Sequence, residues 1–141
     1  MFAGLGAAIA AATWAVFPER FLAFPLYRTE LWLLILLLYP LFSVIPQELV
    51  YRTFFFHRYG PLFGNVRWAA ILINGALFGF AHIIFNNPIA VIGCMVVGTI
   101  IAYRYWMTRS FWAAWFEHAL YGWLVFTVGL GHFFFTGVSN L

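Results

Sequence analysis

The sequence contains no lysine, only one cysteine and few charged side chains of any kind. Charged residues make up 8% of its 141 positions, whereas an ordinary soluble domain has roughly 25%. The net charge of +3 comes from seven scattered arginines, which form no basic face of the kind that binds nucleic acid. A soluble domain and a nucleic-acid-binding protein are therefore both disfavoured.

The single cysteine, Cys94, also excludes two kinds of framework. One chain with one cysteine can build neither a set of disulfides nor a cysteine metal cluster. Residues 1–18 are apolar and rich in alanine, but no positive flank precedes them, which argues against a secretory signal peptide. We expect them to form a first membrane span, either of this protein or of the trailing portion of a longer one.

Apolar and aromatic residues are what the sequence has in abundance, at 65% and 23%. Several apolar stretches approach the roughly 20 residues that an α-helix needs to cross a bilayer. We predict an all-α, polytopic membrane bundle of about four to five transmembrane helices, embedded in the lipid bilayer as one domain. The predicted spans are residues 1–18, a second beginning near residue 31 and interrupted by Pro40 and Pro46, then residues 68–85, 89–103 and 111–136.

Ionisable side chains lie within these apolar spans. Each costs at least about 2.5 to 3.5 kcal/mol near the bilayer centre, so each should face the interior of the bundle and have a partner. The side chains concerned are Glu48 with Arg52, His82, Glu117 with His118, and His132.

Helical spacing groups some of these residues with neighbours. Glu48 and Arg52 are four apart and share a face; they are either an ion pair that fixes helix register or part of a site. Phe78 precedes His82 by the same interval, so its ring should screen that histidine from lipid. A lone histidine is more often structural than functional, because one carbonyl across a helix interface satisfies it.

Near the chain end, Gly122 follows His118 by one turn and lets another group approach the ring closely. Glu117 points about 100° away from His118 and can face a different neighbour. We expect His132 to be structural or interfacial.

Carboxylates, two histidines and an arginine on three apolar helices suit the activation of water. A carboxylate takes the proton while an imidazole orients the water, binds a metal or stabilises an oxyanion.

Three short motifs follow one another on three of the apolar stretches. They read QELVYR at residues 47–52, FGFAH at 78–82 and HALYG at 118–122. Their order and spacing resemble the EExxxR, FxxxH and HxxxN motifs of the CPBP intramembrane protease family. That family includes the CAAX prenyl endopeptidases and bacterial bacteriocin-processing or immunity proteins. The resemblance covers residues 39–126, which would be the catalytic core of a single membrane domain over residues 1–141.

The resemblance implies hydrolysis of a peptide bond in or near the membrane, with a membrane-associated peptide or protein as substrate. It assigns the activation of water to Gln47 or Glu48 together with His82, and metal binding or oxyanion stabilisation to His118. Arg52 would fix the carboxylate. A divalent metal such as zinc would take Glu48, His82 and His118 as ligands. The expected location is multi-pass in the bacterial inner membrane.

Two positions depart from the motifs. Gln47 replaces the first glutamate and Gly122 replaces the asparagine. A neutral amide cannot accept the proton, so Glu48 or Glu117 would have to do so. Three hypotheses remain: an active intramembrane endopeptidase, a catalytically inactive relative that acts as a membrane binding or immunity protein, and a transport or cofactor-binding subunit whose histidines hold a metal or haem.

Overall fold

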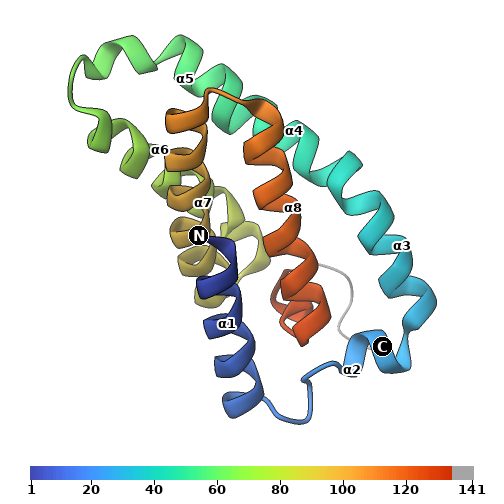
Figure 1. Cartoon of the computed structure of the whole chain (residues 1–141). Coiled ribbons are helices and arrows are strands. Elements are labelled where there is room, and N and C mark those ends of the chain that lie inside the picture. The colour runs from blue at the N-terminus through green and yellow to red at the C-terminus, as the bar shows by residue number, and fades with distance from the viewer. Residues whose placement is uncertain (135–141) are drawn as a thin grey trace.

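The computed structural model describes residues 1–134, and within that range the chain is built of helices without a strand (Figure 1). The α-helices are α1 (Phe2–Val16), α2 (Ala23–Tyr27), α3 (Thr29–Tyr39), α4 (Ile45–Glu48), α5 (Phe55–Arg58), α6 (Arg67–Ala81), α7 (Pro88–Thr108) and α8 (Phe111–Val128). Two π-helical segments, η1 (Pro40–Val44) and η2 (Leu49–Phe54), and three 3₁₀ segments, η3 (Gly60–Phe63), η4 (His82–Phe85) and η5 (Gly131–Phe134), complete the chain. The predicted all-α membrane bundle is confirmed.

Three helices in residues 1–134 are long and apolar enough to cross a membrane: Thr29–Arg58, Arg67–Phe85 and Pro88–Thr108. The helix α1 is a shorter apolar helix, and α8 adds 18 residues beside the long helix. With its apolar composition, this makes the chain an integral membrane protein. Figure 1 shows Thr29–Arg58 running obliquely past α8 as one long helix.

The two prolines of this long helix do not end it. Pro40 opens η1, where the backbone N–H of Ile45 reaches back five residues to the carbonyl of Pro40. Proline has no N–H, so the carbonyl of Leu36 loses its usual donor four residues on. The indole of Trp123 on α8 donates to that carbonyl at 2.9 Å, and the indole of Trp115 donates to the carbonyl of Pro40 at 2.8 Å. Tryptophans of α8 thus satisfy backbone groups around the first proline.

The helices α6 and α7 pack with their backbones close together because α6 carries glycines at the contact. A Cβ atom on Gly75 would lie 2.8 Å from the Cα of Thr99, and one on Gly79 would lie 2.7 Å from the backbone nitrogen of Met95. Small residues spaced four apart are the usual means of close helix contact in membranes. This contact places the α6 face that carries Phe78 against α7.

The observed helix ends differ from the predicted ones in two places. The fourth span continues past the predicted end near residue 103 to Thr108, where Arg109 adopts φ 52° as the cap. The fifth ends at Val128, where Gly129 adopts φ 98° as the cap. Positions 135 and 136 of that predicted span lie outside the described residues.

Candidate active site

The centre of the site is a buried ion pair within the long helix. Glu48 is the last residue of α4, and Arg52 lies one turn further on, in η2. Nε of Arg52 is 3.4 Å from Oε2 of Glu48, and both side chains are fully buried. A buried charge survives only when it is paired and otherwise satisfied, so the remaining contacts of this pair decide what it can do.

The second oxygen of Glu48 is bound by the histidine of the third motif. Nδ1 of His118, on α8, lies 2.7 Å from Oε1 of Glu48, and His118 is 4% exposed. An ionised carboxylate only accepts hydrogen bonds, so Nδ1 carries the hydrogen. Oε1 of Glu48 is therefore hydrogen-bonded to His118, whereas Oε2 faces Arg52 as an ion pair and has no hydrogen-bond partner among the described residues.

The Arg52 guanidinium joins three helices. It donates to Oδ1 of Asn74 on α6 at 2.7 Å and to the carbonyl of Gly98 on α7 at 3.3 Å. Its central carbon lies 4.9 Å from the centre of the Phe78 ring. The amide of Asn74 donates in turn to the carbonyl of Tyr51. These contacts hold the charge in one geometry, which suits the planar fork of arginine.

His82 lies beside this group without joining its hydrogen bonds. Its Nδ1 is 2.7 Å from the carbonyl of Phe78, one turn back. Because a carbonyl only accepts, Nδ1 carries the hydrogen and Nε2 of the neutral ring keeps a lone pair. The Phe78 ring contacts both histidines, with centres 4.7 Å from His82 and 5.3 Å from His118. The two imidazoles therefore flank one aromatic ring.

Sequence reasoning missed two residues of this site. Tyr39, at the end of α3, places its hydroxyl 3.2 Å from Nε2 of His118, and Asn74 holds Arg52. A signal for Asn74 was present, because Asn74, Phe78 and His82 recur at intervals of four, which places them on one face of a helix. Tyr39 carried no such signal, because it ends a leucine-rich stretch without other residues of the site.

Three other candidates lie apart from this hydrogen-bonded group. Gln47 donates through Nε2 to Oγ of Ser43 at 2.8 Å, and its buried Oε1 has no hydrogen-bond partner in the described part of the chain. Oε2 of Glu117 accepts from Nε of Arg104 at 2.7 Å. His132 is exposed, and its Nδ1 contacts the carbonyl of Gly129 at 3.0 Å. None of the three is hydrogen-bonded to Glu48 or His118 within residues 1–134.

The arrangement does not fit the expected zinc site. Over residues 1–134, no three His, Cys, Asp or Glu side chains gather in a way that could hold a metal ion. Of the three candidate ligands, only Glu48 and His118 are bonded to each other. Three protein ligands is the usual minimum for a catalytic zinc, and His82, the first residue of η4, is not brought into such a set.

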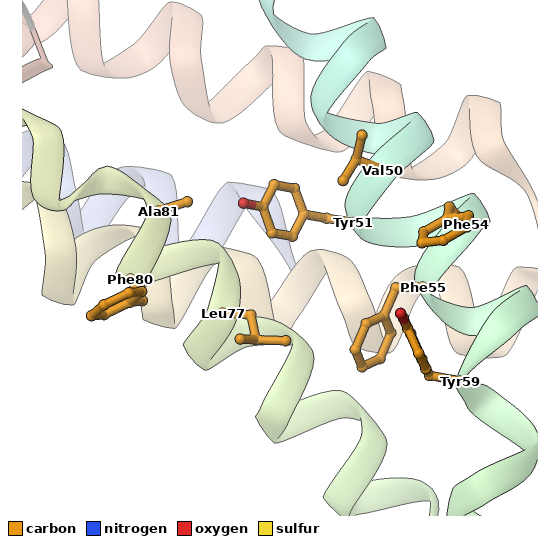
Figure 2. Close-up of a pocket in the computed structure, with 8 residues that line it drawn as sticks. All are labelled: Val50, Tyr51, Phe54, Phe55, Tyr59, Leu77, Phe80 and Ala81. Carbon is orange, nitrogen blue, oxygen red and sulfur yellow. The ribbon is translucent and has the colours of Figure 1, made fainter.

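An apolar groove of about 270 Å³ opens next to the site, between the long helix and α6 (Figure 2). Val50, Tyr51, Phe54, Phe55 and Tyr59 line one side, and Leu77, Phe80 and Ala81 line the other. Figure 2 shows the Tyr51 side chain reaching across the groove towards Ala81, the residue before His82. The Tyr51 ring also meets Phe78 edge-on, with the ring centres 5.2 Å apart. The wall of the groove therefore contacts the same Phe78 ring that packs against both histidines.

Comparison with known proteins identifies the family. The model of the family "Type II CAAX prenyl endopeptidase Rce1-like" matches residues 29–124, which is more than half of the chain and includes all three motifs. No curated protein and no solved structure matches. The resemblance to CPBP intramembrane proteases is thereby confirmed. The chain belongs to the type II CAAX prenyl endopeptidase Rce1-like family.

Proposed function

We propose that this chain is an intramembrane endopeptidase that hydrolyses a peptide bond in or near the membrane through a water activated by side chains. The observation that carries the proposal is the 2.7 Å contact between Glu48 and His118, buried together with Arg52 among apolar helices. An uncompensated charge there would be costly. A matched acid, histidine and arginine beside a second histidine are the parts that such a hydrolysis needs.

The geometry divides the roles among the side chains. His82 takes the proton from water, because its Nε2 keeps the lone pair while Nδ1 is fixed on the carbonyl of Phe78. Glu48 orients His118 and balances positive charge on it, as the carboxylate does in a serine protease triad. The positive charge of protonated His118 then stabilises negative charge on the carbonyl oxygen under attack. The proton held on His82 passes to the leaving amine.

The groove is the place we assign to the apolar part of a membrane-associated substrate. Its lining is aliphatic and aromatic apart from tyrosine hydroxyls, and ligand sites are usually apolar clefts with a few polar groups. Tyr51 lines the groove and contacts the Phe78 ring, and Phe78 contacts both histidines. A substrate seated in the groove would therefore lie close to the two histidines. We place the protein in the bacterial inner membrane.

The test of this proposal is a comparison of two histidines. The full chain in lipid nanodiscs is incubated with a prenylated peptide that ends in a CAAX sequence and with transmembrane peptides, and the products are identified by mass spectrometry. His82→Ala is expected to abolish cleavage without lowering the amount of folded protein. His132→Ala is the matched control, because His132 makes the same contact to a backbone carbonyl but is exposed and outside the site. Cleavage that survives in both His82→Ala and His118→Ala would contradict the proposal.

A second function has its own observation in its favour. Gln47 replaces the first glutamate of the motif, and Glu48 is already paired with Arg52 and hydrogen-bonded to His118. These two features are expected of an inactive relative that grips a partner's membrane segment. Gln47→Glu separates the two functions. Cleavage that appears only in this variant favours the binding role, whereas full activity of the parent chain removes it.

A further inference from the structure

His118 is held from two sides by the same long helix. Nδ1 faces Oε1 of Glu48 at 2.7 Å, and Nε2 faces the hydroxyl of Tyr39 at 3.2 Å. The carboxylate requires the hydrogen on Nδ1, so Nε2 accepts the hydrogen of the Tyr39 hydroxyl while the ring is neutral and donates to the hydroxyl oxygen when the ring is charged. The tautomer and the orientation of the ring are therefore both fixed, the second by a residue outside the three motifs.

Gly122 explains how Tyr39 reaches this position. A Cβ atom on Gly122 would lie 2.6 Å from the Tyr39 hydroxyl oxygen and closer still to its ring. The hydroxyl thus occupies the volume in which any side chain at position 122 would begin. Position 122 is one turn after His118, where the third motif ordinarily carries asparagine.

We propose that Tyr39 takes over, from the long helix, the hydrogen bond at His118 that position 122 of α8 does not supply in this chain. The proposal rests on the proposed peptidase function and adds a positioning residue to it. The two positions form one exchange. Gly122 stands where the motif has asparagine, and the space that its missing side chain leaves is filled by the Tyr39 hydroxyl. The Tyr39 ring is held edge-on against Phe126, with ring centres 5.7 Å apart, so its place does not depend on the hydroxyl.

That last point makes Tyr39→Phe a clean test. The variant keeps the ring and its packing and removes one oxygen. We expect kcat to fall about tenfold, as the loss of one positioning hydrogen bond would cause, with KM and the amount of folded protein unchanged. Tyr103→Phe is the matched control, since Tyr103 stacks on Trp68 and lies outside the site. A kcat equal to that of the parent in Tyr39→Phe would overturn the proposal.

Rescue distinguishes this role from mere packing. Gly122→Asn alone should lower activity, because the new side chain meets the Tyr39 ring. Tyr39→Ala should also lower it. Tyr39→Ala combined with Gly122→Asn should recover activity above that of Tyr39→Ala alone, since the amide then enters the vacated space next to His118. A double variant that folds as well as Tyr39→Ala and is no more active contradicts the exchange.

A measurement without substrate keeps this inference separate from the peptidase function. The chain has four histidines, so ¹⁵N-histidine spectra in nanodiscs can be assigned by single substitutions. In Tyr39→Phe, the Nε2 resonance of His118 should move and those of the other three histidines should not. If the parent chain cleaves nothing, the proposed function fails and this shift alone decides the inference: a moved resonance supports the hydrogen bond, and an unmoved one overturns it.

Discussion

Nη1 of Arg52 lies 2.7 Å from Oδ1 of Asn74, and neither side chain is exposed. The contact joins the long helix to α6 at the level of the candidate site. Since Asn74 also donates to the backbone carbonyl of Tyr51, its amide is used at both ends. Arg52 is therefore part of the framework that positions Glu48 as well as the charge that balances it.

Removal of Arg52 should strongly destabilise the protein. Arg52→Met leaves Glu48 buried without its countercharge and Asn74 without its donor, which should cost about 3 to 5 kcal/mol. Unfolding of the purified protein by denaturing detergent would measure the loss. The control is Arg20→Met, because Arg20 is half-exposed and only 3.9 Å from an exposed Glu19; its effect should be about 1 kcal/mol or less. Equal losses of stability in the two variants would show that the buried Glu48–Arg52 pair contributes no more than an exposed pair.

Two buried acids should respond differently in activity. Glu48→Gln removes the negative charge that faces Nδ1 of His118 and replaces one of the two acceptor oxygens by an NH2 donor, and should lower kcat by about 10²-fold or more. Glu117→Gln removes an acid that is as buried and as closely paired, but with Arg104 instead of His118. We expect turnover per folded molecule to stay near that of the parent in the second variant, as measured with the same peptide. A large loss of turnover in Glu117→Gln would show that Glu117 takes part in the reaction, contrary to this prediction.

Glycines on neighbouring helices should differ in their tolerance of a methyl group. Gly79→Ala places a Cβ atom 2.7 Å from the backbone of Met95, so α6 and α7 must separate, at a cost of about 1 to 3 kcal/mol. Nothing lies within 4 Å of a Cβ atom on Gly93, which is also in α7. Gly93→Ala should be neutral or stabilise by up to about 1 kcal/mol. Thermal unfolding of both variants in one detergent tests the contrast.

The indole that replaces the missing donor of Pro40 should also be measurable. Trp123→Phe leaves the carbonyl of Leu36 without the hydrogen bond that Nε1 gives it, which should destabilise by about 1 to 3 kcal/mol. Trp112→Phe is the control, because Trp112 is 65% exposed and its replacement should cost about 0.5 kcal/mol or less. A Trp123→Phe variant as stable as the control would show that the carbonyl finds another donor.

The sequence predicted the fold class because long apolar stretches with few charges admit little else. It also predicted that Glu48 and Arg52 share a face, since four residues make about one turn. Residue spacing alone could not predict that His118, 70 positions away, meets Glu48, because that contact depends on which helices pack together; only the family resemblance placed the two residues in one site. The spacing allowed Glu117 a neighbour different from that of His118, and the structure places Glu117 against Arg104.

Tyr39 and Glu48 are nine positions apart in the sequence. In a regular α-helix, nine steps of about 100° would leave their side chains on opposite sides, about 180° apart. The π-helical turn at Pro40–Val44 lies between them and accommodates one extra residue, which reduces the angle to about 80°. One imidazole can therefore touch both residues. Converting this turn to regular α-helix at unchanged length would keep every side chain of the site and yet rotate Tyr39 away from His118, whereas removing one residue together with the π turn would restore the angle of about 80°. The helical phase set by this segment is therefore as much a part of the site as the residues themselves.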